Sequence, residues 1–216
     1  MPIQRLARRL AGAALAALVA SAPAYGYDDP VEKRTFTLPS YTTVGGRTIA
    51  NVRVGYETYG KLNAAGDNAI FVAHFYSGNS HAAGKYKPSD AAFGYWDPII
   101  GSGRPIDTDR YFVISADTLA NLNTKDPNVV TTGPASIDPS TGRPYGMRFP
   151  VVSMRDSVRV HKALVDSLGV KRLAAVAGAS GGSVQAMEWG LMFSLIRSVG
   201  VWSNSFANQS FTRPLA

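Results

Sequence analysis

Residues 176–183 constrain the fold of this chain more than any other stretch. They read Val-Ala-Gly-Ala-Ser-Gly-Gly-Ser and complete an apolar run that begins at residue 173, a pattern typical of a strand buried on both faces. Residues 183–189, which read Ser-Val-Gln-Ala-Met-Glu-Trp, are rich in good helix formers. A buried strand that turns through a glycine-flanked serine into a helix predicts an α/β protein with Ser180 at the tip of a sharp turn.

The glycines around Ser180 suit a serine nucleophile. The backbone of a serine in such a turn is strained, so the residues two before and two after it must be small, and Gly178 and Gly182 occupy these positions. The turn also directs the first backbone N–H groups of the helix, beginning with Gly181, toward any oxygen that gains negative charge beside Ser180. A plain turn in a chain with 21 glycines is the alternative, and the flanking strand and helix favour the nucleophile.

The composition indicates one folded domain behind a targeting segment. A chain of 216 residues with 45% hydrophobic side chains can bury a core of its own. Within residues 1–24, three arginines precede an apolar stretch at 10–20 and an Ala-Pro-Ala cleavage site. We therefore expect a secretory signal peptide over 1–24 and a single domain over 25–216. A mitochondrial presequence is the alternative, and the choice between Sec and twin-arginine export stays open.

Charge and cysteine content exclude several classes of function. Removing residues 1–24 takes away three of 22 basic residues and no acidic one, which leaves 19 basic against 15 acidic side chains. The remaining Lys and Arg form no basic run, so we expect no nucleic-acid partner. The absence of cysteine from the sequence excludes disulfides and thiolate ligands. We expect no metal and no bound cofactor, an exported protein of a bacterial periplasm, and membrane contact only during export.

Hydrophobic patterns predict the remaining elements. Runs with the character of strands lie at 34–38, 49–59, 69–73, 111–114 and 197–202. Gly45 and Gly46 predict a hairpin between the first two runs, and the continuous apolar runs predict central parallel strands. An apolar stripe over 153–168 predicts a helix that ends at Gly169, and the helix after Ser180 is expected to reach Phe193. This order predicts a mostly parallel sheet with helices on both faces.

The segment 117–150 is too long for a simple connection. It is rich in Asn, Thr, Gly and Pro, the residues of turns. Loops of this length in a compact domain are usually functional or disordered. We expect this one to form a wall of the active-site entrance.

Several blocks of the sequence resemble the homoserine O-acetyltransferase family. The first, at 56–63, reads Tyr-Glu-Thr-Tyr-Gly-Lys-Leu-Asn, and the last, at 185–189, reads Gln-Ala-Met-Glu-Trp. The blocks between them follow in the order of the family, at 74–84, 96–97, 100–101, 106–108, 132–134, 144–146 and 149–150. Such a series of blocks in one order makes the resemblance specific.

The resemblance implies an α/β-hydrolase fold in which a serine is acylated and then passes the acyl group on. Carried over by position, Ser180 is the nucleophile, and the backbone N–H groups of Gly181 and Tyr76 form the oxyanion hole. The implied acceptor is a small alcohol such as homoserine, with acyl-CoA as co-substrate. Since acyl-CoA is not expected outside the cytoplasm, an exported esterase acting on a small-molecule ester is an alternative. A non-catalytic fragment or binding module that retains the turn is another.

Some side chains near Ser180 depart from the family pattern. Gly181 stands where the family usually has methionine, and Ala179 and Ser183 stand where it has glycine. Phe75 and Tyr76 replace the usual Ala-Leu pair. The two oxyanion roles use only main chain, so we expect them to survive, in a pocket with a different lining.

The base of a catalytic triad has no clear candidate among the histidines of the sequence. In this fold the acid and the histidine follow the serine in the chain, so the resemblance places both beyond Ala216. We therefore expect an α/β-hydrolase domain that is incomplete at its C-terminus and nearly inert as it stands. His74, His81 and His161 all precede Ser180. We expect His161 to be buried or to cap its helix, and the other two to shape the pocket.

Overall fold

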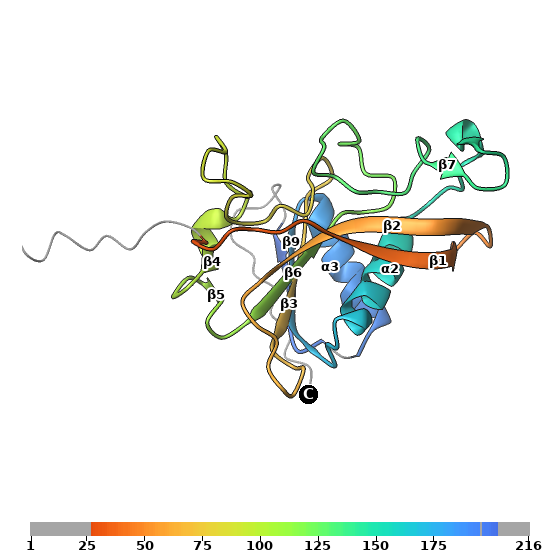
Figure 1. Ribbon diagram of the computed structural model, residues 1–216. Helices are drawn as coiled ribbons and strands as arrows, with labels where there is room; N and C mark the ends of the chain where they lie inside the picture. The colour runs from red at the N-terminus through yellow and green to blue at the C-terminus, as the bar shows by residue number, and fades with distance from the viewer. Residues whose placement is uncertain (1–26, 195, 203–216) are drawn as a thin grey trace, which may run out of the picture.

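The computed structural model describes residues 27–194 and 196–202, which are built around a six-stranded sheet (Figure 1). The strand order is β1-β2-β6-β3-β9-β10. The strands are β1 (Arg34–Thr42), β2 (Thr48–Tyr59), β3 (Ala69–Ala73), β6 (Phe112–Ala116), β9 (Leu173–Ala179) and β10 (Val199–Trp202). The expected signal peptide at 1–24 lies outside the described residues, and none of the described helices is long and apolar enough to cross a membrane.

The pairing of the strands follows the sequence pattern. β1 and β2 form the expected antiparallel hairpin, in which the N–H of Gly46 donates to the carbonyl of Thr43 at 2.9 Å and Gly46 has φ 80°. β6 runs antiparallel to β2 but parallel to β3, and β9 pairs in parallel with both β3 and β10. Every residue of β3 is buried, as its uninterrupted apolar run predicts.

Within residues 27–194 two α-helices accompany the sheet, and both lie where the sequence predicts them. α2 (Met154–Ser167) is capped at its N-terminus by Ser153, whose side chain forms a capping box with Asp156, and the left-handed Gly169 (φ 80°) follows its end. α3 (Gly181–Met192) starts directly after Ser180, which is its N-cap residue. Each helix boundary therefore has a local chemical cause.

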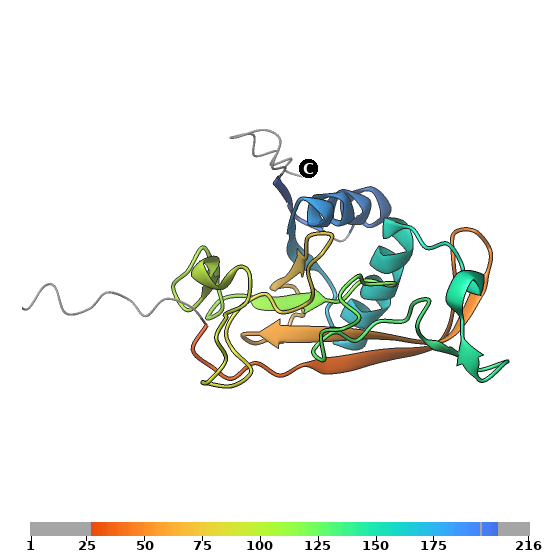
Figure 2. The ribbon, with the colours of Figure 1, turned by 90° about the horizontal axis from the view of Figure 1, so that it is seen from above.

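Both α-helices of the described residues cover one face of the sheet (Figure 2). On that face Phe71 and Ile114 pack with Val158 and Leu164 of α2 and Trp189 of α3. The sequence pattern led us to expect helices on both faces. The opposite face is instead covered by the irregular segment 80–107, which contains η1 (Asp97–Ile99), β4 (Ile100–Gly101) and β5 (Ile106–Asp107).

The long segment 117–150 divides into two parts. Its first part folds back on the sheet, where the carbonyl of Val130 accepts a hydrogen bond from the N–H of Gly55 at 2.7 Å. Its second part holds the short strands β7 (Ile137–Asp138) and β8 (Arg143–Pro144) and the turn η2 (Gly146–Arg148), and β7 projects beyond the sheet at the right of Figure 1. The first part therefore stays close to β2, and Asn121 also joins it to the loop that follows β3.

Candidate active site

Ser180 lies at the junction of β9 and α3 in a conformation that serine rarely adopts. Its φ is 54° and its ψ is −123°, and its carbonyl accepts a hydrogen bond from the N–H of Ser183 at 2.9 Å. Holding a non-glycine residue in such a region costs about 1–3 kcal/mol. The side chain is exposed rather than packed inside the protein. The strained turn therefore presents a hydroxyl group to solvent at the end of a buried strand.

The glycines on either side of Ser180 are required by close approach of the backbone. A Cβ atom on Gly178 would lie 2.2 Å from the carbonyl oxygen of Gly182, and one on Gly182 would lie 2.2 Å from the carbonyl oxygen of Ala73. Both contacts are with main chain, which cannot rotate away. The packing of α3 against β9 and β3 thus depends on the missing side chains.

The two backbone N–H groups assigned to an oxyanion hole come from segments that meet beside Ser180. A Cβ atom on Gly181 would lie 2.8 Å from the backbone nitrogen of Tyr76. Within the described part of the chain, neither the Gly181 nor the Tyr76 N–H donates a hydrogen bond. Two unpaired donors next to an exposed hydroxyl form a geometry suited to an anionic oxygen.

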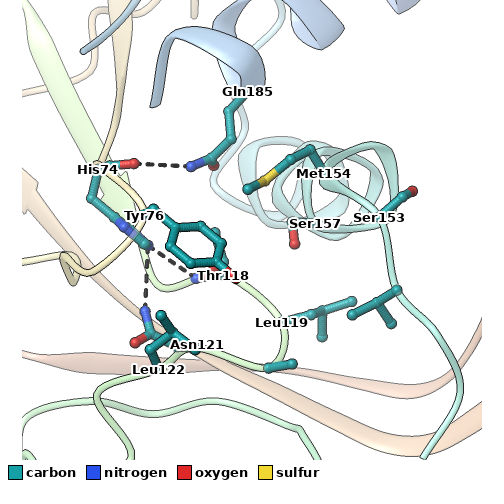
Figure 3. A pocket seen from close by; sticks show the side chains of 12 residues that line it. His74, Tyr76, Thr118, Leu119, Asn121, Leu122, Ser153, Met154, Ser157 and Gln185 are labelled. Atoms are coloured by element: carbon teal, nitrogen blue, oxygen red, sulfur yellow. Dashed lines mark hydrogen bonds between the residues drawn. The ribbon is translucent and has the colours of Figure 1, made fainter. Parts of the chain in front are cut away.

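His74 joins the loop after β3 that contains Tyr76 (residues 74–80, the Tyr76 loop) to the segment after β6, and Figure 3 shows its contact with Thr118. The N–H of Thr118 donates to Nε2 at 3.2 Å, so Nε2 is the acceptor and Nδ1–H donates to the carbonyl of Phe75 at 2.7 Å. The side chain is 1% exposed, and burial lowers the pKa of His74 to about 4. His74 is therefore a neutral structural residue, in keeping with the expectation that it shapes the pocket.

Two further side chains fix the same loop, and neither was predicted from the sequence to have a role there. Asn121 donates from Nδ2 to the carbonyl of Gly78 at 3.0 Å, and Gln185 donates from Nε2 to the carbonyl of His74 at 3.0 Å. Both residues are buried. Gln185 belongs to a block that resembles the family, which was the only signal available for it, and Asn121 lay among ordinary turn residues.

A buried cluster of charges lies behind the loop. Glu57 contacts Lys33 at 2.8 Å and His81 Nδ1 at 3.0 Å, and Asp117 accepts hydrogen bonds from the N–H groups of Ser80 (2.7 Å) and Val130 (2.9 Å). Burial raises the pKa of Asp117. Burial also pushes the pKa of Glu57 upward, but hydrogen bonding from His81 and the charge of Lys33 outweigh it, so the pKa is lowered. The cluster thus joins Ser80 and His81, which follow the Tyr76 loop, to Glu57 of β2 and to Asp117, which follows β6.

The three described histidines thus form hydrogen bonds with groups other than Ser180. His81 faces Glu57, and His161 is fully buried with Nε2–H donating to the carbonyl of Asp117 at 2.9 Å. Within the described residues no hydrogen bond joins a histidine to Ser180. The same residues contain no group of three or more His, Asp or Glu placed to hold a metal ion.

Relatives of known activity match most of the described chain. A homoserine O-acetyltransferase from Carboxydothermus hydrogenoformans is 45% identical over 170 residues, which cover 78% of this chain and 43% of the relative. The structure of a homoserine O-acetyltransferase from Bacillus anthracis matches with a TM-score of 0.78 and 44% identity, over 80% of this chain and 46% of that one. The chain has the α/β-hydrolase fold and resembles the homoserine O-acetyltransferases over most of its length. No protein-family model matches it.

A solved structure that is named as an esterase is also similar to this chain. Esterase E22 matches with a TM-score of 0.78 and 56% identity, over 79% of this chain and 47% of that one. The resemblance and the fold class expected from the sequence are confirmed. The chain spans less than half the length of each of these three relatives.

The two buried histidines predict a pH-dependent stability for this α/β-hydrolase chain. Burial lowers the pKa of both His74 and His161 from 6.5 to about 4, so the unfolded chain binds more protons between these values. Stability is therefore lost as the pH falls from 6.5 toward 4. We expect each histidine to remove about 2 kcal/mol from the free energy of unfolding between pH 7 and pH 5, measured by urea denaturation.

A His161→Gln variant separates this effect from that of the carboxylates. Glutamine retains a donor for the carbonyl of Asp117 but cannot titrate, so the variant should lose about half of the pH dependence over the same range. Asp117 itself acts in the opposite direction, because its raised pKa favours the folded state as the pH falls. An unchanged pH dependence in the variant would show that His161 is not the group responsible.

Proposed function

We propose that this chain carries the nucleophile of a serine acyl-transfer enzyme. The Ser180 oxygen forms a bond to the carbonyl carbon of a small ester or acyl donor, and the leaving alcohol or thiol departs with the proton that the serine loses. The N–H groups of Gly181 and Tyr76 stabilise the oxyanion formed in between, and one such donor contributes about 3 kcal/mol. The observation that carries the proposal is an exposed hydroxyl on a strained turn beside two unpaired amides.

The molecule that takes the acyl group from Ser180 distinguishes two versions of this function. Transfer to a small alcohol such as homoserine, with acyl-CoA as the donor, follows the named activity of the two homoserine O-acetyltransferases. Transfer to water follows the name of esterase E22, which is the more similar in sequence of the two structures. The proposed export of the chain through residues 1–24 to a bacterial periplasm favours water, because acyl-CoA is a cytoplasmic donor. Neither version requires a metal or a bound cofactor.

Residues 1–216 by themselves should acylate slowly. A serine without a positioned base is a poor nucleophile, and loss of the histidine alone costs roughly a million-fold in one well-studied serine protease. The three histidines of the sequence precede Ser180, and their hydrogen bonds in the structure go to other groups. A non-catalytic role for the chain is favoured by the same observation.

The acyl-enzyme itself provides the test. The chain is incubated with p-nitrophenyl acetate, and the protein mass is followed with time before peptide mapping. We expect one slowly formed acetyl adduct on the peptide that contains Ser180. Homoserine should shorten the lifetime of the adduct if the enzyme is a transferase and leave it unchanged if it is a hydrolase. An adduct only on lysine residues, or none, would support the non-catalytic alternative.

A further inference from the structure

A cavity of about 140 Å³ lies beside the Tyr76 loop, between this loop, the segment after β6 and the two α-helices (Figure 3). Tyr76 lines it and also supplies one of the two unpaired amides next to Ser180. A cavity of similar volume in another protein holds benzene, so this one has room for about six non-hydrogen atoms. It is therefore large enough for one arm of a small substrate that reacts at Ser180.

Gln185 brings an unsatisfied hydrogen-bond acceptor to this cavity. Its side chain is 1% exposed, and its Nε2 donates to the carbonyl of His74, which determines the orientation of the carboxamide. Its Oε1 accepts no hydrogen bond from any described residue. Figure 3 shows the carboxamide above the ring of Tyr76, with the nitrogen toward His74. Since buried acceptors without a partner destabilise a protein, the cavity is suited to a ligand that donates a hydrogen bond.

The described lining favours an uncharged donor. The described residues that line the cavity include no Asp, Glu, Lys or Arg, and their polar groups include the hydroxyls of Thr118 and Ser157. Leu119 and Met154 supply apolar surface. An ammonium or carboxylate group would lose its hydration here without a counter-charge, whereas a hydroxyl can both donate and accept.

We propose that the cavity is a specificity subsite for a short, uncharged substrate arm that carries a hydroxyl group, which donates to Gln185 Oε1. This inference rests on the proposed acyl transfer at Ser180 and adds a preference among its substrates. The arm can belong to either half of an ester, the acyl group or the alcohol. Its hydroxyl is distinct from the oxygen atoms that react.

Two isosteric pairs of esters test binding at the subsite under conditions in which no acyl transfer takes place. The ¹⁵N-labelled Ser180→Ala chain is titrated with 2-hydroxyethyl acetate against propyl acetate, and with ethyl 3-hydroxypropanoate against ethyl butanoate. In at least one pair we expect the hydroxylated ester to bind roughly three- to tenfold more tightly, the effect of one hydrogen bond, and to shift the side-chain amide of Gln185 in the NMR spectrum. The pair that discriminates identifies the half of the ester that enters the cavity.

Variants of the cavity wall provide the controls. Ser157→Leu fills the cavity and should abolish the preference, whereas Ser167→Leu, the same change at an exposed position of the same helix, should leave it intact. If Ser157→Leu does not fold, Leu122→Trp at the half-exposed rim serves the same purpose. Equal affinities within both pairs, as expected if only water meets Gln185 Oε1, would overturn the inference. Because the titration uses a chain without the nucleophile, its outcome is independent of whether Ser180 forms an acyl-enzyme.

Discussion

Replacing Ser180 with alanine is expected to abolish covalent labelling of the chain by a fluorophosphonate probe. The hydroxyl of Ser180 is exposed, and the two unpaired amides beside it can stabilise the phosphonyl oxygen as it gains charge. One such donor contributes about 10²–10³ in rate, so labelling at Ser180 should exceed that of an ordinary serine by at least about 100-fold even without a base. The measurement is the initial rate of labelling by in-gel fluorescence, with peptide mapping of the modified residue.

A Ser180→Gly variant shows whether lost labelling reflects lost structure. Glycine removes the hydroxyl but adopts positive φ without strain, so this variant should be more stable than Ser180→Ala by about 1 kcal/mol and equally unlabelled. Ser183 is a matched neighbour in the turn, but it is buried and its hydroxyl donates to the carbonyl of Ser180. Labelling that persists in both variants, or that maps to Ser183, would contradict the assignment of the nucleophile.

Gly182→Ala is expected to lower the free energy of unfolding by about 3 kcal/mol or more, and to prevent folding if the chain is less stable than that. The new methyl group would lie 2.2 Å from the carbonyl oxygen of Ala73, so either α3 or β3 must move. Overpacking that shifts main chain costs about 1–3 kcal/mol and occasionally more. The measurement is urea denaturation followed by circular dichroism.

Gly190→Ala is the matched control, because it introduces the same methyl group into the same helix. Its Cβ would lie 3.1 Å from a side-chain methyl of Val199, which can give way, and alanine is favoured over glycine inside a helix by about 1 kcal/mol. We expect the stability of this variant to change by less than about 1 kcal/mol. Similar losses in the two variants would show that helix packing, rather than the approach to Ala73, governs stability here.

The elements with a local cause were the ones the sequence predicted well. A capping box and a terminal glycine delimit α2, a pair of glycines forms the β1–β2 turn, and unbroken apolar runs mark β3 and β6. The strained turn at Ser180 belongs to this group, because Gly178 and Gly182 stand two residues before and after the serine, and the contact of Gly178 with Gly182 lies within the turn itself. Each of these signals lies within a few residues of the feature that it specifies.

Features that depend on distant partners were missed. Glu57 is fully buried in β2 beside Lys33 and His81, and both of these partners lie outside β2. Asn121 and Gln185 anchor the Tyr76 loop from other parts of the chain, and no local pattern marks them as anchors. The sequence also led us to expect helices on both faces, whereas an irregular segment covers one of them.

By itself, the sequence determined the order of strands and helices, the position of Ser180 and the resemblance to the homoserine O-acetyltransferases. The tertiary structure alone decided which polar groups are buried together, where the cavity beside Tyr76 lies and that Gln185, which lines it, has a buried oxygen without a partner. The reason is physical. Backbone conformation is set by neighbouring residues, whereas the energy of a buried charge or acceptor depends on partners that only folding brings within hydrogen-bonding distance.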